Sequence, residues 1–404
     1  MSNSFLVPTV IAAEALMQLR NNMVMGGLVH REYKNEFRKV GSSIQIRRPV
    51  KFTRQSGAVR VGQDVTEGYI TLTLSNRHHV SWAFATQDLT LTIEDYSERY
   101  VTPACIELAN GVDSDLLGLY DDIGWSVGTP GTTPATFSVL GDAAVKLDNA
   151  ACPDDGRRST VLNPAARWAM ADALKGTFEP KLASDTIRRG YLGTIANTMI
   201  YGDQNVKVHT TGTNCDDASI LTDLAATLSD TYSASVNTST LHVDGLTAAT
   251  GTFTAGDILT VSGKYTVNPR NRQSTGQLQQ FVVTADVTAA SSECDVVVWP
   301  RVIASGAYQT VSASIADGVA VTGVGAASTG YPQNMMFHKN AFALVFVPLE
   351  LPRSATFKAR STMEGVSVRV VEDFDIDNDE EIIRLDILNA TQTLYPELAC
   401  RIWG

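Results

Sequence analysis

A long run of alternating apolar and polar residues near the N-terminus most constrains what this chain can fold into. Apolar residues share one parity in two stretches, which predicts extended strands: Ile44, Ile46, Val50 and Phe52, and then Ile70, Leu72, Leu74, Val80, Trp82 and Phe84. A Gln-Ser-Gly turn at 55–57 separates the two arms. An isolated two-stranded hairpin is marginal in water, so an excursion this long needs support from the rest of the chain or from a neighbour. Its solvent-facing side is basic and carries Arg47, Arg48, Lys51, Arg54 and Arg60.

Helical periodicity surrounds this extended segment. Apolar residues recur at helical spacing after Pro8, and a stripe from about residue 88 to 121 predicts one long helix. At 1.5 Å per residue that helix is on the order of 50 Å long. A shorter helix is predicted over Pro164–Leu174, because Asn163 is a suitable N-cap and Pro is tolerated in the first turn.

The segment from about 238 to 329 is rich in Thr, Val, Gly and Ser and has almost no helical stripe. Short strands separated by turns favour a small barrel or sandwich inserted into a host domain. We expect a turn at Ser262-Gly263, and a linker with a short Leu221–Leu228 helix before the module. The expected strands of the module are Ile258–Val261, Leu278–Ala285, Val296–Trp299 and Ala307–Ser312. Strands return at 341–347, 366–371, 382–388 and 400–402.

Composition excludes several classes of protein. The chain has 404 residues, 44% hydrophobic and 19% charged, which is typical of folded globular domains. The net charge of −11 argues against binding nucleic acid through its phosphates, because such binding needs a basic surface. The five cysteines are far apart and form no CxxC or Cys/His cluster, so neither a zinc site nor a disulfide framework is expected. We expect no membrane span and no targeting segment, and hence a protein made in a cytosol.

Three motif matches fail on their context. Residues 124–128, GWSVG, match a nucleophile elbow around Ser126, but that motif needs a strand before it and a helix after it. Gly263-Lys264 lacks the glycine spacing of a phosphate-binding loop. His78 and His79 are neighbours in a strand and point to opposite faces, so they cannot share one metal ion. The sequence therefore predicts no catalytic, cofactor-binding or metal-ligating residues, and no enzyme.

An acidic run near the C-terminus resembles the start of a calcium loop but lacks the glycine and glutamate that such a loop requires. Residues 366–376 alternate in polarity, residues 377–379 suit a turn, and Ile383, Leu385 and Ile387 follow. We therefore interpret it as a hairpin that faces solvent or another subunit. Its acidic residues are Asp373, Asp375, Asp377, Asp379, Glu380 and Glu381.

The order of these segments resembles that of tailed-phage major capsid proteins of the Hong-Kong-97 fold, and the inserted module is most similar to that of the P-twenty-two-type coat proteins. The resemblance covers nearly the whole chain. The segments that carry it are STVLNPAARWAMADAL, RRGYLGTIANTMIYGDQNVKVHTTGT, AGDILTVSGKYTVNP, NMMFHKNAFALVFVPLELP and the closing segment that ends in LYPELACRIWG.

The resemblance implies an α+β capsid fold with an N-terminal arm, an extended β-loop, a long spine helix, peripheral and axial domains, and an inserted small β-barrel. The corresponding segments are an arm at 1–40, the β-loop at 41–87, the spine helix with parts of the peripheral and axial domains at 88–237, the barrel at 238–329 and a return to the axial and peripheral domains at 330–404.

The resemblance also implies a function. Copies of the chain would assemble as hexamers and pentamers into an icosahedral shell around packaged double-stranded DNA, without sequence-specific DNA binding. It implies a scaffolding protein and a portal as partners, leaves open a decoration protein, and places the protein in a virion capsid assembled in the host bacterial cytoplasm. We expect the five basic residues of the loop and the six acidic residues of the hairpin to make contacts between subunits, the alternative being that both sets merely face solvent.

Two other functions remain open from the sequence. A nanocompartment shell protein of the same fold would differ in cargo rather than in wall. A serine hydrolase that uses Ser126, with a β-rich accessory domain, would need a base and an acid that the sequence does not place.

Overall fold

The computed structural model describes residues 8–33, 43–60, 62–63, 65–85, 97–174, 192–225, 227–363 and 366–404. The chain forms two compact units, each assembled from separate stretches of sequence. The first unit comprises Met1–Gln45, Thr71–Leu117 and Phe342–Gln392, and the second comprises Ile46–Ile70, Gly118–Ala341 and Thr393–Gly404. Both units contain helices and sheets, which confirms the predicted α+β class.

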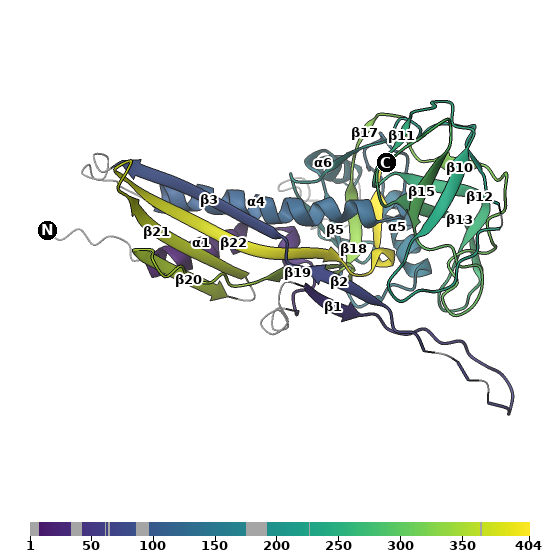
Figure 1. Ribbon diagram of the computed structural model, residues 1–404, viewed down its shortest axis with the longest axis horizontal. Coiled ribbons are helices and arrows are strands. Elements are labelled where there is room, and N and C mark those ends of the chain that lie inside the picture. The colour runs from purple at the N-terminus through teal and green to yellow at the C-terminus, as the bar shows by residue number, and fades with distance from the viewer. Residues whose placement is uncertain are drawn as a thin grey trace. The chain divides into compact units, whose positions relative to one another are not determined.

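The first unit is built on one sheet, in which β19, β22, β21 and β20 are neighbours and β3 pairs with the other edge of β22 (Figure 1). Helix α1 packs against β20 and β21, and Gly111 of α4 lies against the ring of His78 on β3. The helices are α1 (Pro8–Asn22), η1 (Met25–Gly27), η2 (Ser97–Val101) and α4 (Thr102–Gly118). The strands are β3 (Asn76–Ala85), β19 (Phe342–Phe346), β20 (Phe357–Met363), β21 (Val366–Asp375) and β22 (Glu380–Thr393).

The predicted acidic hairpin is confirmed as β21 and β22. Its register pairs Val370 with Leu385 and Asp375 with Glu380. Val366, Val368 and Val370 are buried on one parity, because alternate residues of a strand share a face. The core face ends before the turn.

The predicted long helix is present over its described part. A π-helical turn, η2, leads into α4, and a 3-10 turn, η3 (Leu119–Asp122), follows. Leu108, Val112 and Leu116 of α4 are buried, as the apolar stripe predicts. Residues 88–96 of the expected helix lie outside the described residues.

The extended segment differs from expectation in its second arm. β3 pairs with β22 along its whole length, from Asn76 with Asn389 to Ala85 with Glu380. The alternation up to Phe84 therefore reflects a sheet strand whose ladder partner comes from about 300 residues away. The loop itself runs between β1 (Ser43–Arg47) and β2 (Tyr69–Thr73), which form a two-stranded sheet.

The second unit contains a host sheet in the order β4-β23-β18-β5-β7-β6. Helix α6 begins at the predicted place, where the Asn163 side chain accepts a hydrogen bond from Ala166 N at 2.8 Å. The strands are β4 (Ser126–Val127), β5 (Arg158–Leu162), β6 (Thr194–Ile195), β7 (Thr198–Gly202), β18 (Asn334–His338) and β23 (Ala399–Ile402). The helices are α5 (Phe137–Asn149), α6 (Pro164–Leu174), η4 (Lys339–Ala341) and η5 (Pro396–Leu398).

The inserted module leaves and re-enters the host through two paired strands, β8 (Val208–Thr210) and β17 (Gly330–Pro332). Beyond this stem, six strands follow the order β16-β12-β13-β15-β10-β9. An isolated bridge between Leu221 of β9 and Ala320, next to β16, brings the two ends of the sheet together. The six strands of this sheet are β9 (Leu221–Thr222), β10 (Ser239–Asp244), β12 (Ile258–Val267), β13 (Ser274–Val283), β15 (Cys294–Trp299) and β16 (Val321–Gly323). Two further strands, β11 (Thr252–Phe253) and β14 (Val287–Thr288), form a separate two-stranded sheet.

Inward-facing residues of the module form their own core, which includes Phe253, Phe281, Leu241 and Val296. This core allows the module to fold as a compact part of the second unit. The sheet of the module starts at β9, before residue 238, where the sequence placed the start of the module.

Three local predictions in the module are wrong. Ser262-Gly263 does not reverse the chain, because Gly263 takes a φ of +70° and the register shifts there as a bulge within a continuous β12. Residues 221–228 contain β9 instead of a short helix, since Thr222 pairs with Val243. The strand expected over Ala307–Ser312 is a loop, in which Thr310 N donates back to Ile303 O at 2.9 Å.

Candidate assembly surfaces

The loop between β1 and β2 is a long excursion that extends away from these two strands (Figure 1). Its two arms are tied together by Gln63, whose Oε1 accepts hydrogen bonds from Thr53 N at 2.8 Å and Thr53 Oγ1 at 3.0 Å. Arg272, from the turn between β12 and β13, donates from Nη2 to Phe52 O at 2.8 Å. The loop thus has side-chain support in place of a continuous strand ladder.

Two of the predicted contact residues, Arg48 and Lys51, bind within their own chain. Arg48 Nη2 donates to Leu394 O at 2.6 Å, and its guanidinium lies 5.5 Å from the Tyr395 ring centre. Lys51 N donates to the Tyr308 hydroxyl at 3.2 Å, and its ammonium lies 6.0 Å from that ring. Both line a cavity of about 420 Å³ at the base of the loop. The Arg48 guanidinium and the backbone of Lys51 therefore anchor the loop.

The other three basic residues face solvent. Arg47 has an 81% exposed side chain and lies 3.3 Å from Glu67, while Arg54 and Arg60 are exposed farther along the loop. Apolar side chains accompany them: Phe52 is 60% exposed and Val59 is 83% exposed. The sequence did not predict this exposure, because an apolar residue on an alternating strand is normally a core residue. An extended segment with exposed apolar and cationic side chains has the chemistry of an interface.

The acidic residues gather in the β21–β22 hairpin of the first unit. Asp375 holds the turn by accepting hydrogen bonds from Asn378 Nδ2 at 2.8 Å and Asp377 N at 3.0 Å, and these bonds lower the pKa of Asp375. Asp373 Oδ1 accepts from Thr356 Oγ1 at 3.0 Å. Phe374 and Ile376 are 50% and 83% exposed. The remaining predicted residues, Asp377, Asp379, Glu380 and Glu381, lie in the turn or in the first residues of β22.

Two carboxyl groups of this hairpin, those of Glu372 and Glu381, share a hydrogen bond on the core-facing side of the sheet. The pKa of Glu372 is raised to about 7; burial is the largest cause, and the neighbouring Glu381 is the second. Glu372 continues the parity of Val366, Val368 and Val370. That parity was the one sequence signal that could have pointed to it.

The two predicted sets lie in different units. The basic residues belong to the second unit and the acidic ones to the first. That these two sets pair between subunits stays a prediction.

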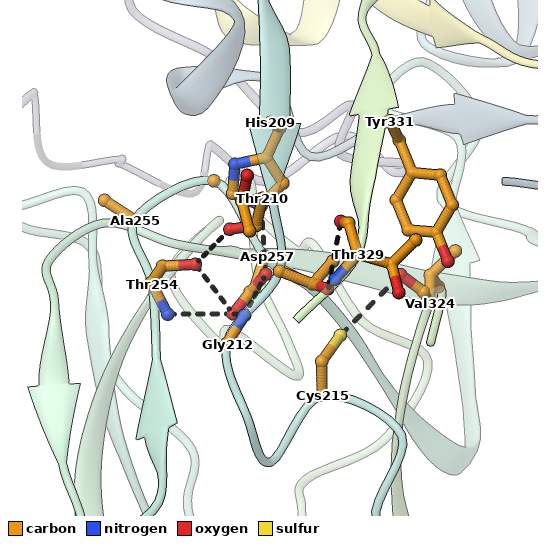
Figure 2. A network of polar contacts seen from close by, with 12 residues as sticks. His209, Thr210, Gly212, Cys215, Thr254, Ala255, Asp257, Val324, Thr329 and Tyr331 are labelled. Carbon is orange, nitrogen blue, oxygen red and sulfur yellow. Dashed lines mark hydrogen bonds and ion pairs between the residues drawn. The ribbon is translucent and has the colours of Figure 1, made fainter. Parts of the chain in front are cut away.

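A buried polar junction at the stem of the module was not foreseen from the sequence (Figure 2). Asp257 accepts hydrogen bonds from Thr254 N at 2.8 Å and Gly212 N at 3.1 Å, and its Oδ1 lies 2.9 Å from His209 Nε2. Asp257 and His209 are 1% and 5% exposed. His209 lies on stem strand β8, and Asp257 directly precedes β12 of the module. This junction therefore ties the module to its stem.

The same junction reaches the C-terminal strand. Arg401 of β23 donates from Nη1 to Gly256 O at 2.7 Å, and its guanidinium lies 5.3 Å from the ring centre of Tyr120. Burial lowers the pKa of Arg401 to about 10. The Tyr120 hydroxyl lies 3.2 Å from His209 Nδ1. The next residue along the chain, Asp121, has a pKa raised to about 6; burial is the largest cause, and the charge of the adjacent Asp122 is the second.

The geometry around Ser126 does not suit a nucleophile. Ser126 is 4% exposed in β4, and its Oγ accepts a hydrogen bond from Gln280 Nε2 at 2.8 Å. An activated serine needs a base in that position, and an amide nitrogen cannot accept the proton.

Comparison with known proteins gives one family. The family model described as "P22 coat protein - gene protein 5" matches residues 1–403. A search of curated proteins finds no significant match. Within the described residues, no helix has the length and apolar character needed to cross a membrane.

Three solved structures illustrate the likeness. A chain of Mycobacterium phage Che8 is 13% identical with a TM-score of 0.48, over 94% of this chain and 90% of that one. A capsid chain of cyanophage P-SCSP1u is 10% identical with a TM-score of 0.42, over 90% and 84%. A mature-capsid chain of bacteriophage PhiM1 is 9% identical with a TM-score of 0.42, over 89% and 81%. These values are low, so the assignment rests on the family match. The chain belongs to the P22 coat protein family and is a major capsid protein, a structural component of an icosahedral virion shell and not an enzyme.

Proposed function

We propose that the loop between β1 and β2 is an assembly arm that packs on a neighbouring subunit of the shell. The observation that carries this proposal is the coincidence of Phe52, Val59 and Val65, which are 60%, 83% and 58% exposed, with the exposed cations Arg54 and Arg60. Apolar side chains on a long loop gain stability when a second chain covers them.

We propose the acidic hairpin of a neighbouring copy as the surface that receives the arm. It offers carboxylates around Asp377 and the exposed apolar side chains of Phe374 and Ile376. Each exposed ion pair contributes only ~0–1 kcal/mol. Closed symmetry repeats every contact through the shell, so small increments accumulate.

The remaining features of the proposal concern the assembly as a whole. Hexamers and pentamers would enclose packaged double-stranded DNA, and a chain of net charge −11 would keep the wall from gripping the phosphates. A scaffolding protein and a portal would take part in assembly in the host cytoplasm, and a decoration protein is a further candidate partner. We propose the same order of arm, loop, spine, module and closing segments, with β3 assigned to the sheet of the first unit and β9 to the module.

A charge-swap experiment tests the arm. Reversing Arg54 and Arg60 to Glu should lower the yield of closed shells measured by sedimentation, because carboxylates would then face carboxylates. Reversing Asp373 and Asp377 to Lys in the same chain should restore the yield. Arg48→Glu is unsuitable, since Arg48 binds Leu394 O in its own chain.

The matched control is Arg353→Glu, which reverses an exposed arginine outside the loop. It should leave the yield unchanged. If the Arg54/Arg60 reversal assembles as well as this control at low and at high salt, the loop cations do not contribute to the interface. If the swap in the hairpin fails to restore assembly, the acidic partner is a different surface.

A further inference from the structure

The outer surface of the inserted module brings together a histidine and carboxylates that are far apart in sequence. His242 Nε2 lies 3.6 Å from Asp223 Oδ2 and 3.8 Å from Glu293 Oε2. One ligand atom from each of the three residues lies within 4.8 Å of the other two. Their side chains are between 34% and 54% exposed, so a solvated ion can reach them.

Three neighbouring strands position these groups. Asp223 directly follows β9, and its N donates to His242 O at 3.1 Å, which sets it beside the histidine on β10. Glu293 precedes β15 and closes a tight turn with Ala290 through two backbone hydrogen bonds of 2.9 and 3.2 Å. Buried Leu241 and Val243 flank His242, so the histidine points outward while its neighbours pack into the core.

A fourth residue fixes the orientation of the imidazole. Asp295, which faces His242 in the β10–β15 register, places Oδ1 2.8 Å from His242 Nδ1. An imidazole that donates from Nδ1 to a carboxylate presents the lone pair of Nε2, and this arrangement recurs behind metal-binding histidines. Here Nε2 faces Asp223 and Glu293.

We propose that Asp223, His242 and Glu293 bind a divalent transition-metal ion of the zinc class, with Asp295 as the positioning residue of His242. Zinc bonds to nitrogen and oxygen are ~2.0–2.2 Å, so neighbouring ligands of a tetrahedral ion are separated by ~3.4 Å. The distances of 3.6 and 3.8 Å from His242 Nε2 are within a few tenths of that value. Water would complete the coordination at this exposed position.

Charge favours the same occupant. Three carboxylates surround one imidazole, and Asp244 adds a fourth carboxylate two residues along β10. A divalent ion neutralises both carboxylate ligands and joins β9 to β10 and to the turn before β15.

Metal binding to the full chain tests the site. Subunits freed of metal with a chelator are titrated with zinc chloride by calorimetry, and with magnesium chloride as a comparison. We expect one saturable zinc ion per chain, weakened at least ~10-fold in His242→Gln and ~10–100-fold in Asp295→Asn. His79→Gln and Glu350→Gln, which change exposed residues elsewhere, should leave the affinity unchanged.

Three results of the titrations would overturn the site. The first is the absence of a saturable equivalent of zinc. The second is equal binding of zinc by wild type and His242→Gln, and the third is equal binding of magnesium and zinc by wild type; either would indicate a diffuse acidic patch. Wild-type chain loaded with cobalt(II) gives a readout that needs no variant to fold: X-ray absorption must show one imidazole ligand, and a spectrum with oxygen ligands only rejects the proposal.

Discussion

Removal of the Asp257 carboxylate should loosen the attachment of the inserted module to its stem. Asp257 is 1% exposed and accepts hydrogen bonds from the backbone N–H groups of Gly212 and Thr254. A side chain in place of the Gly212 hydrogen would meet Thr252 O at 2.2 Å, so only glycine allows this close approach. Asp257→Ala leaves both backbone donors without their acceptor in a site that is closed to water.

The magnitude follows from the number of orphaned groups. Each buried donor that loses its acceptor costs ~1–3 kcal/mol. The Thr254 hydroxyl can rotate toward Thr210 O, to which it already lies at 3.1 Å, so it adds little. Two backbone donors together with His209 therefore predict a loss of about 4 kcal/mol.

Asp257→Asn should cost less, about 1–2 kcal/mol, for a structural reason. The amide oxygen can replace Oδ2 and keep accepting from Gly212 and Thr254. The amide nitrogen then faces His209 Nε2, which can accept if the imidazole proton moves to Nδ1, where the Tyr120 hydroxyl lies 3.2 Å away. The junction would keep its hydrogen bonds and lose its charge.

Hydrogen exchange followed by mass spectrometry measures these effects locally. Exchange of the peptides that contain Gly212 and Thr254 should accelerate about a thousand-fold in Asp257→Ala, since 1.4 kcal/mol corresponds to about tenfold. The control is Asp286→Ala, an exposed carboxylate in the same module that accepts one hydrogen bond from Ala255 N at 2.7 Å. It should change exchange by less than about tenfold. Equal acceleration in the two variants would show that burial of Asp257 carries no special cost.

Two further predictions concern ionisable groups. The pKa of Glu372 is raised from 4.5 to about 7 in the folded chain, so folding takes up a proton between these values and the free energy of unfolding should fall as pH rises through them. Urea midpoints at about pH 5 and about pH 8 should show this decline, and Glu381→Gln should reduce it without abolishing it because burial is the larger cause; a midpoint that rises with pH would contradict the assignment. All five cysteines are buried, with pKa values raised by burial to about 11 for Cys152 and Cys294 and about 12 for Cys105, Cys215 and Cys400. The native chain should therefore resist an aqueous thiol reagent, whereas in urea five thiols per chain should react. Rapid labelling of any one thiol in the native state would contradict this.

Local patterns in the sequence predicted the elements whose stability is local. The stripe of Leu108, Val112 and Leu116 marked the spine helix, and Asn163 marked the start of α6, because helix spacing and capping involve residues three or four apart. The β21–β22 hairpin was readable for the same reason, since its two strands and its turn are contiguous.

Errors arose where one local pattern fits two structures. A Ser-Gly pair fits both a turn and a bulge, and at Gly263 the pairing of β12 with β13 on both sides selects the bulge. Alternation up to Phe84 fits an arm of a loop or a sheet strand, and β22, about 300 residues later, makes it a sheet strand. In both cases the deciding hydrogen bonds come from another strand.

Sequence pattern and family resemblance together were enough to establish the class of this protein, its acidity, its chain order and the basic and acidic segments that it presents. They did not separate Arg48 and Lys51, which bind Leu394 and Tyr308 of their own chain, from Arg54 and Arg60, because these two partners are hundreds of residues away. The stem junction of His209, Asp257 and Arg401 and the surface cluster of Asp223, His242 and Glu293 were equally hidden. Such sites form only when strands distant along the chain become neighbours in a sheet, and no spacing along the chain records which strands those are.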